Sequence, residues 1–505
     1  MTRFLLAAAL AVPLLSAAPA FAEVQGAWVA TDRTVDCSSY DTIRRDLLKP
    51  DMTDEQKALA LYDFFRQRVY HYKNLPETRE PLKTVNIIGN TLCGSQATCM
   101  KGLLQEVAGL KTRVVSHPGH TFYEVYYDGK WHGFDTMTNF YVFTRGEGKD
   151  RYVASFAELN KDPSLIKEAV KEGRSVTALC PCGDDPLAFA DKIQITDYEP
   201  ERSDWSIKDY SLRQGEELVR SWWPHGKPLP GSFDGGRPGP VHTCGTRDRQ
   251  AEPELFQFWE PYGIPKFAPS TSVSYRHYAN GWIAYSPDLT NAHAVSDGGA
   301  KLEGVQATKN GLAGQGTWEY RVKSPYHITS AELSLDVDLA SADSAVTVEV
   351  TDARGQWQPV PLEGLAKVQT LSLDKHVVRA NRGRYEYGVR IRLEGHHTAL
   401  RRQHLKTWFQ HNAMAAPHLM PGKNRVTVEV AEEAGLKAAP LTVVYRYKDA
   451  PKWDGAVKSV EQTVTKNGQS FDVALPETDK LPQMQDLTIR YGALAWRPEP
   501  VKQGE

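Results

Sequence analysis

The stretch that decides the fold runs from Cys93 to Asp135 and reads CGSQATCMKGLLQEVAGLKTRVVSHPGHTFYEVYYDGKWHGFD. It opens with a helical pattern, in which apolar residues recur at steps of three and four and so share one face. These residues are Ala97, Met100, Leu104 and Val107. We expect Asn90 or Thr91 to cap the start of this helix and Gly109 to end it. Cys93 then lies in the first turn, where unpaired backbone N–H groups and the helix dipole favour a thiolate.

A β-hairpin is predicted at the end of the same stretch. Two strand-like runs surround Asp128-Gly129, which is the strongest short-range hairpin signal. A two-residue turn at this point makes His120 and Asp135 diagonal neighbours on one face, about 7–8 Å apart between backbones. His132 then points to the other face and His117 lies beyond the hairpin, so the predicted geometry selects His120.

A thiol, an imidazole and a carboxylate brought together in this way are the parts of a nucleophilic site. Cys93 is the expected nucleophile, His120 its base, and Asp135 the acid that orients the imidazole. The oxyanion would bind to the backbone N–H of Cys93 and to one upstream donor that the sequence does not identify. The alternative is that each residue is structural, since a lone cysteine at a helix start is commonly a buried thiol.

The chain here resembles the bacterial branch of the transglutaminase-like superfamily, which has a papain-like thiol fold. The matching pieces are Cys93–Ala97, Gly109–Val115 and Gly119–Asp135. The resemblance covers about residues 50–145 and implies an α+β papain/transglutaminase-like domain with the same nucleophile, base and acid. Phe122 stands where many members have Trp, and Thr136 follows the acid where Pro is common. The family includes cross-linking acyltransferases, proteases, amidases and members without activity, so the fold alone does not fix the reaction.

The N-terminal segment predicts export. Arg3 precedes an apolar run from Phe4 to Leu15, and Ala20-Phe21-Ala22 is a small-x-small cleavage site, so residues 1–22 read as a signal peptide. A membrane anchor is the weaker interpretation, because Pro13 interrupts a run that is already short for a span. We therefore expect a periplasmic or secreted protein without a membrane span after cleavage.

Charge and motifs narrow the expected partners. The chain has 60 Lys and Arg residues against 62 Asp and Glu residues, a balance that gives no reason to expect a nucleic-acid partner. It contains no phosphate-cradling loop, dinucleotide fingerprint or zinc-protease motif, and we expect no cofactor. The expected substrate is a protein, a peptide or peptidoglycan.

The chain has six cysteines, and in an oxidising compartment each is expected to be either a free thiol or part of a disulfide. With Cys93 free and Cys99 a buried thiol of the helix, two disulfides are expected among the remaining four, with open connectivity. These four are Cys37, Cys180, Cys182 and Cys244. A zinc site from Cys180, Cys182, His242 and Cys244 is the weaker alternative, because the spacings match no familiar zinc signature.

The remaining chain predicts all-β sandwich, immunoglobulin-like domains. The expected limits are 23–222 for the thiol domain, 223–254 for a linker rich in Pro and Gly, 255–420 for a β-sandwich and 421–505 for a small immunoglobulin-like domain. Alternating runs predict the strands, among them Trp318–Val322, Ala331–Val337, Tyr387–Leu393 and Leu441–Tyr447. A basic run at 396–404 is expected to be a solvated connection.

Aromatic residues of the β region allow two interpretations. Trp282, Trp318, Tyr320 and Trp357 could stack on sugars, or they could fill the sandwich core, which is the commoner role. The sequence thus predicts a secreted thiol enzyme that acts on amide or peptide bonds through an acyl-thioester. The alternative is a non-catalytic envelope or surface protein that binds glycan or protein through the same domains.

Overall fold

The computed structural model describes most of the chain beyond the predicted signal peptide. The described residues are 23–71, 78–117, 120–137, 140–171, 194–196, 198–223, 225, 280–339, 343–362, 368–379, 383–395, 397–450 and 454–499. The predictions for residues 1–22, for Cys180, Cys182, His242 and Cys244, and for nearly all of the linker fall outside these residues.

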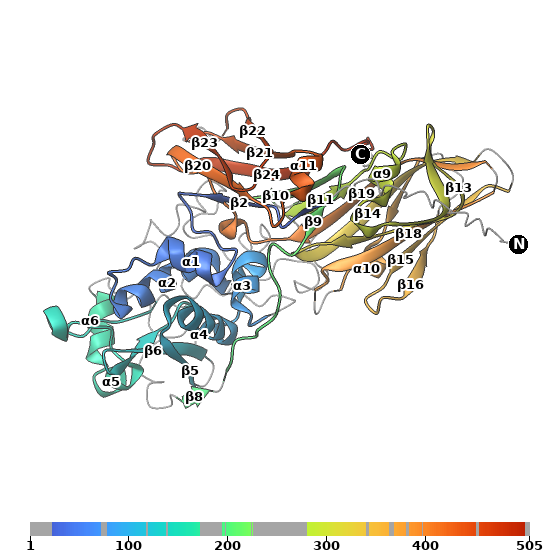
Figure 1. The fold of residues 1–505 in the computed structure, drawn as a ribbon. Coiled ribbons are helices and arrows are strands. Elements are labelled where there is room, and N and C mark those ends of the chain that lie inside the picture. Colours follow the sequence, from blue (N-terminus) through green and yellow to red (C-terminus); the bar gives the residue numbers. More distant parts are fainter. Residues whose placement is uncertain are drawn as a thin grey trace, which may run out of the picture.

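An α/β region occupies one end of the molecule (Figure 1). Its helices are α1 (Tyr40–Leu47), α2 (Asp54–Arg68), α3 (Pro81–Lys83), the π-helical turn η1 (Thr84–Ile88), α4 (Cys93–Ala108), the 3-10 turn η2 (Gly148–Asp150), α5 (Phe156–Lys161) and α6 (Ser164–Lys171). Its antiparallel sheet has the order β7 (Lys130–Phe134), β6 (His120–Tyr127), β5 (Lys111–His117) and β8 (Gln194–Thr196). Two short parallel strands, β3 (Tyr70–His71) and β4 (Asn90–Thr91), lead into α4.

Helix α4 packs on this sheet through the apolar stripe that the sequence predicts. Ala97, Met100, Leu104 and Val107 are all buried in one core with Leu61 and Phe65 of α2 and Val114 and Val125 of the sheet. Gly109 ends the helix with a φ of 69°, in the left-handed region that glycine adopts without strain. The expected side-chain cap is wrong, because Asn90 and Thr91 form β4 and the cap position falls on Leu92, which makes no side-chain cap hydrogen bond.

The predicted hairpin and its register are confirmed. Asp128 and Gly129 both have positive φ values, 48° and 78°, as a two-residue primed turn requires. Tyr123 pairs with Phe134 across the hairpin, and Val125 pairs with His132. His132 therefore lies on the face opposite to that of His120, as the sequence predicts.

The rest of the described chain is largely β-sheet with sandwich-like packing. Its strands are β10 (Glu216–Ser221), β11 (Gly281–Tyr285), β12 (Lys301–Thr308), β13 (Gly311–Lys323), β14 (His327–Leu339), β15 (Ala345–Thr351), β16 (Trp357–Val360), β17 (Val368–Ser372), β18 (Glu386–Glu394), β19 (Thr398–Gln410), β20 (Gly422–Glu429), β21 (Leu441–Lys448), β22 (Lys458–Val464), β23 (Gln469–Leu475) and β24 (Gln483–Tyr491). Short helical segments between them are α9 (Ala292–Ser296), η7 (Asp297–Gly299), α10 (Asp374–Val377), η8 (Ala413–Ala415) and α11 (Ala434–Ala438). The strands predicted at Trp318–Val322, Ala331–Val337, Tyr387–Leu393 and Leu441–Tyr447 all lie inside strands of the structure.

One large sheet runs through this β region in the order β16-β15-β18-β13-β19-β11-β10-β24-β21-β22, with β12, β14 and β17 joined at its sides. Two hydrophobic cores lie against it. The first is formed by residues of β13, β14, β15, β18 and β19, with Trp318 and Ile391 among them. The second lies between the strands β10, β21 and β24 and a separate three-stranded sheet, β2 (Trp28–Thr31), β20 and β23.

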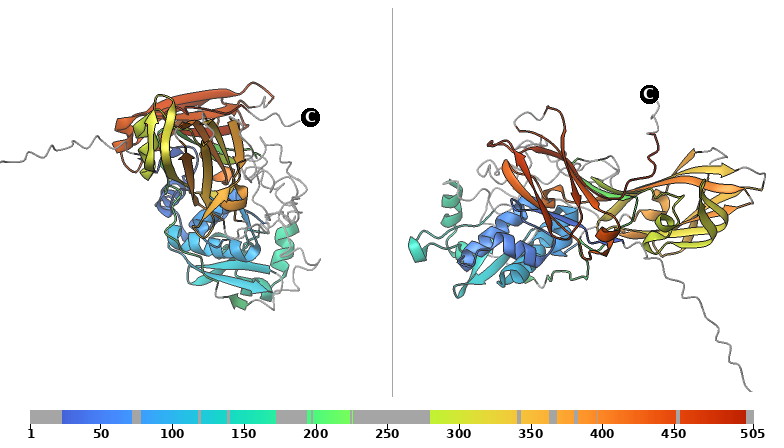
Figure 2. Two further views of the ribbon diagram at one scale, coloured as in Figure 1. Left: turned by 90° about the vertical axis from the view of Figure 1, so that its right-hand side faces the viewer. Right: turned by 45° about the horizontal axis from the view of Figure 1, so that its top comes forward.

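Strands from the N-terminal part complete the C-terminal sandwich. β2 pairs with β20, and β10 pairs with both β11 and β24. A further two-stranded sheet is formed by β1 (Val24–Gln25) and β9 (Ser211–Leu212), which both belong to the N-terminal part. The predicted limits at 222 and 421 therefore cut through continuous sheets, and Figure 2 shows from two further sides how closely the α/β and β regions lie together.

Two further expectations are wrong. The basic run at 396–404 is not a solvated connection over its described part, because residues from Thr398 onward form β19, where Gln403 is fully buried and Arg402 pairs with the buried Asp336. Cys37 was expected in a disulfide, but it is a free and fully buried thiol. Cys99 is a free buried thiol, as predicted. Among the described helices, none is long and apolar enough to cross a membrane.

Candidate active site

Cys93 is the first residue of α4, at the end of the short strand β4. The helix covers the hairpin strand β6, so its N-terminus faces the side chains at the start of that strand. The Cys93 thiol is half-buried and lies near His120 and the backbone N–H of Thr121, whose charge and hydrogen-bonding groups act on its pKa. The structure thus joins the predicted nucleophile to the predicted base.

His120 and Asp135 form a direct hydrogen bond. The distance from His120 Nε2 to Asp135 Oδ2 is 2.6 Å, and both side chains are almost completely buried. Because Nε2 faces the carboxylate, Nδ1 is the ring nitrogen left for the thiol. The three predicted residues therefore form one connected row, Cys93–His120–Asp135.

The electrostatics of this row favour an ion pair. Burial alone would lower the pKa of His120, but the charge and hydrogen bond of Asp135, with a further contribution from Cys93, raise that pKa to about 10. Burial raises the pKa of Cys93, but the hydrogen bond and charge of His120 and the N–H of Thr121 outweigh burial and lower it below its usual value. A thiolate beside an imidazolium is the protonation state that these shifts support.

Asp135 is held by its own chain and by α2. Its second carboxylate oxygen accepts from the backbone N–H of Met137 at 2.9 Å. Its backbone carbonyl accepts from Tyr62 of α2 at 3.2 Å, and its backbone pairs with Phe140 in an isolated bridge. These contacts fix the carboxylate and leave Oδ2 aimed at His120.

Sequence reasoning missed two residues beside the row. Gln96, one turn after Cys93, is buried; its Oε1 accepts from Thr136 Oγ1 at 3.2 Å and its Nε2 donates to the Thr91 carbonyl at 3.3 Å. Gln96 thereby connects the start of α4 to Thr136, the residue after Asp135.

Tyr198 was also missed. Its ring lies 3.6 Å from the point where a Cβ on Gly94 would stand, beside the N-terminus of α4. The spacing of Gln96 from Cys93 was visible in the sequence, whereas nothing local marked Tyr198.

His132, the second histidine of the hairpin, does not join the row. It is fully buried, stacks on Tyr127 with ring centroids 3.6 Å apart, and hydrogen-bonds the Val153 carbonyl. The selection of His120 over His132 from the hairpin geometry agrees with this arrangement. The backbone of His117 pairs with that of His120 across β5 and β6.

A polar joint connects the β region to the segment that precedes Cys93. Asn412 Nδ2 donates to the carbonyls of Val85 at 2.7 Å and of Arg68 at 2.8 Å. The backbone N–H of Asn412 donates to the carbonyl of Asn86 at 2.8 Å. Gly89, with a φ of 68°, packs so closely that a Cβ there would lie 2.9 Å from the Asn412 amide carbon. The turn η1, which ends five residues before Cys93, is therefore held by a residue that lies 327 positions after Val85 in the chain.

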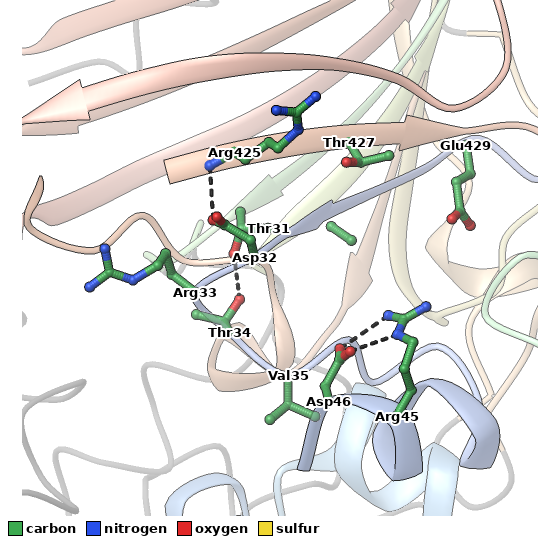
Figure 3. A pocket seen from close by; sticks show the side chains of 11 residues that line it. Thr31, Asp32, Arg33, Thr34, Val35, Arg45, Asp46, Arg425, Thr427 and Glu429 are labelled. Atoms are coloured by element: carbon green, nitrogen blue, oxygen red, sulfur yellow. Dashed lines mark hydrogen bonds and ion pairs between the residues drawn. The ribbon is translucent and has the colours of Figure 1, made fainter. Parts of the chain in front are cut away.

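A cavity of about 450 Å³ lies between β2, β20 and α1 (Figure 3). Arg45 and Asp46 pair with each other at 2.7 Å, and the backbone N–H of Arg425 donates to Asp32 at 2.8 Å. In Figure 3 the Arg425 guanidinium points away from Arg33, so the cationic groups do not converge on one point. Arg44, next to Arg45, bonds the carbonyl of Val107 at the end of α4 opposite to Cys93, which separates this cavity from the triad.

The predicted sugar-stacking aromatics divide between core and surface. Trp318 and Tyr320 are buried in the sandwich core, so the structural interpretation holds for them. Trp282 and Trp357 are half-buried. In the described part of the chain no three His, Cys, Asp or Glu side chains are grouped so as to hold a metal ion.

No protein-family model and no curated protein matches the chain. Solved structures that resemble it include the tandem CBM22-1-CBM22-2 domain of Paenibacillus barcinonensis Xyn10C, at 12% identity and a TM-score of 0.14, over 43% of this chain and 92% of that one. The pilus backbone protein RrgB of Streptococcus pneumoniae matches at 13% identity and a TM-score of 0.11, over 34% of this chain and 42% of that one. Full-length RrgB matches at 11% identity and a TM-score of 0.14, over 64% and 59%. Likenesses of this size carry no argument about function.

Proposed function

We propose that this protein is a periplasmic or secreted thiol enzyme, with an α+β papain/transglutaminase-like domain, that acts on amide or peptide bonds through an acyl-thioester. The observation that carries the proposal is the row Cys93–His120–Asp135, in which a thiol at a helix start lies beside an imidazole that hydrogen-bonds a buried carboxylate at 2.6 Å. Each member has the partner that its role requires.

The reaction begins when Cys93 Sγ attacks the carbonyl carbon of the substrate, forming a C–S bond. His120, protonated in the ion pair, gives its proton to the amide nitrogen as the C–N bond breaks and the amine leaves. His120 then takes a proton from the incoming water or amine, which attacks the thioester carbon. The C–S bond breaks and the Cys93 thiolate is restored. Asp135 keeps the imidazole oriented throughout and stabilises its charged form.

The start of α4 suits the oxyanion of this reaction. Cys93 is the first residue of the helix, so its backbone N–H has no acceptor within the helix. Positive helix-end potential favours a negative oxygen at the same place. The Cys93 N–H is therefore the donor that we propose for the oxyanion.

The proposed substrate is a protein, a peptide or peptidoglycan, and the acyl group passes to water or to an amine. Both outcomes use the same thioester, and the nucleophile that reaches the thioester carbon decides between them.

The test is capture of the acyl-enzyme. Mature protein is mixed at neutral pH with peptidoglycan fragments or with a glutamine-containing peptide mixture, and intact-protein and peptide mass spectrometry follow acyl adducts. We expect an adduct on Cys93 and release of amine, both absent in Cys93→Ala. Cys99, a free and fully buried thiol of the same helix, is the internal control and should stay unmodified. Amine release that persists in Cys93→Ala would contradict the proposal.

A further inference from the structure

A second candidate site lies on the large sheet, away from the triad. The strands β10, β11, β19, β14 and β17 are neighbours there, and Figure 1 shows β11, β19 and β14 running side by side. Trp282 pairs directly with Trp408, and Lys406 pairs with Ala284 on one side and Glu332 on the other. Because paired residues project to the same side of a sheet, these side chains share one face. The alternate residues, such as Ile283 and Phe409, are buried in the core on the opposite face.

This face contains a cavity of about 400 Å³, which is within the usual size of small-ligand sites. It is lined by Glu217, Trp282, Ala284, Glu332, Ser334, Thr370, His404, Lys406, Trp408, Arg497, Pro498 and Glu499. We call this set the tryptophan cavity.

Two indole rings give the tryptophan cavity an aromatic wall. The Lys406 ammonium lies 4.3 Å from the ring centre of Trp282 and 4.8 Å from that of Trp408. It therefore brings N–H donors to the aromatic surface itself. Trp282 is half-buried and lines the cavity, and the His225 ring packs edge-to-face against it with ring centroids 4.7 Å apart.

Hydrogen-bonding groups surround the indoles. His404 is nine-tenths buried, and its Nδ1 lies 3.1 Å from the carbonyl oxygen of Trp496. A carbonyl can only accept, so Nδ1 carries the proton; burial lowers the pKa of His404 to about 4 and keeps the ring neutral. Nε2 of the neutral ring is then an acceptor, and His404 is one of the residues that line the cavity. Ser334 and Thr370 share a hydrogen bond of 2.8 Å between their hydroxyls, and each hydroxyl keeps further bonding capacity.

The charges of the cavity favour a neutral ligand. Glu217 is almost completely buried and bonds both Arg497 at 2.8 Å and Arg490 at 3.3 Å, so its charge is balanced within the protein. Lys406 pairs with Glu332 in the strand register and Glu499 also lines the cavity, so the remaining charges of the lining form no cationic cluster for an anion. The cavity lies on the face of a sheet, where the strand backbones already pair with one another, so an extended peptide cannot add as a strand.

We infer that the tryptophan cavity binds a neutral saccharide. The apolar C–H face of a pyranose ring would lie against Trp282, and its hydroxyls would bond Lys406, His404 and the Ser334–Thr370 pair. A ring that is apolar on its face and polar around its rim matches a wall of indoles with donors and acceptors around it. This inference does not depend on the chemistry of Cys93.

The experiment uses the full mature chain carrying Cys93→Ala, so that turnover does not interfere. Isothermal titration calorimetry measures binding of three neutral probes: tetramers of N-acetylglucosamine, of β-linked glucose and of α-linked glucose. Trp282→Ala removes the exposed indole. Trp357→Ala is the matched control, because Trp357 is also a half-buried surface indole, with an arginine, Arg390, 3.9 Å from its ring centre. Thr370→Val removes one hydroxyl at an exposed strand position and keeps the β-branched shape.

We expect saturable binding of at least one probe, about tenfold weaker in Trp282→Ala. We also expect weaker binding in Thr370→Val and unchanged binding in Trp357→Ala. The thermal unfolding midpoint of each variant shows that it is folded, and the Thr370→Val comparison decides the question if Trp282→Ala is unstable. Absence of saturable binding to all three probes would overturn the inference. Equal losses in the Trp282 and Trp357 variants would overturn it as well.

Discussion

The hairpin of β6 and β7 and the polar joint at η1 are both buried, hydrogen-bonded structures, but the chain builds them in opposite ways. The hairpin places His120 and Asp135 together from residues 15 positions apart. The joint brings Asn412 to the carbonyl of Val85, 327 positions away. The hairpin residues of the proposed site are thus local in sequence, whereas the segment that leads into Cys93 is held by a residue that follows Val85 by 327 positions. The β region therefore supports the segment that precedes the proposed nucleophile.

The hairpin itself contains a second, smaller contrast. His120 and His132 are buried on opposite faces of the same two strands. His120 faces a carboxylate and a thiol, whereas His132 faces backbone carbonyls and the ring of Tyr127. The partner of each imidazole, and not its burial, separates a reactive histidine from a structural one.

The largest effect is expected from His120→Ala. This change removes the proton donor to the leaving amine and the charge that lowers the pKa of Cys93, so acyl-enzyme formation should slow by about 10²–10⁴-fold. Rapid-quench mass spectrometry of the Cys93 adduct measures the rate. A rate close to that of the unchanged protein would show that the hairpin has no catalytic role.

Asp135→Asn should have the next largest effect. Without the carboxylate, burial lowers the pKa of His120 and the ion pair with Cys93 weakens, so the rate falls and the whole pH–rate profile changes. The measurement is the rate of Cys93 adduct formation between pH 5 and 9. A profile of unchanged shape and merely reduced height would contradict an orienting and charge-stabilising role for Asp135.

Asn412→Ala tests the joint. The carbonyls of Val85 and Arg68 lose their donors, so the free energy of unfolding should fall by about 1–3 kcal/mol. Displacement of η1 should also slow the reaction of Cys93, by about tenfold. Denaturant unfolding and Cys93 alkylation measure the two effects.

The matched control is Asn424→Ala. Asn424 is another fully buried amide, and its Nδ2 donates to the carbonyls of Met420 at 2.7 Å, Gly422 at 3.1 Å and Val473 at 3.2 Å within the C-terminal sandwich. It should lose comparable stability and leave Cys93 alkylation unchanged. The joint would be only structural if both variants affected alkylation equally.

The smallest effect is expected from His132→Gln. The amide can keep a bond to the Val153 carbonyl but loses the stacking on Tyr127, so we expect about 1 kcal/mol of lost stability and no change in Cys93 reactivity. Thermal unfolding and alkylation at pH 7 give the two values. Loss of Cys93 reactivity in a folded His132 variant would remove the contrast between the two histidines.

The sequence predicted the features that depend on short-range pattern. The periodicity of α4 and the Asp128-Gly129 turn were sufficient to place Cys93, His120 and Asp135 and the register between β6 and β7. The alternation of apolar residues was sufficient for the strands of the β region. In each case one local rule sets the geometry.

Long-range pairing was beyond these rules. Nothing in Trp28–Thr31 indicates that it completes a sheet with β20, and nothing near Asn412 indicates Val85 as its partner. The basic run before Gln403 was misread because its arginines pair with Asp336 and Asp338 of β14. Asp336 is buried and its charge is balanced by Arg402 of the neighbouring strand, a partner that sequence order does not show.

The most direct test of the activated thiol is the pH dependence of alkylation, read separately for Cys93 and Cys99 in one protein by peptide mass spectrometry. Burial raises the pKa of the Cys93 thiol, but His120 lowers it further than burial raises it. Cys93 should therefore label rapidly well below pH ~8.5, which is the pKa of an ordinary thiol. His120→Ala should remove this low-pH reactivity, and Cys99 should stay unlabelled in both proteins. Slow labelling of Cys93 at neutral pH, or labelling that is unaffected by His120→Ala, would contradict the thiol-enzyme account.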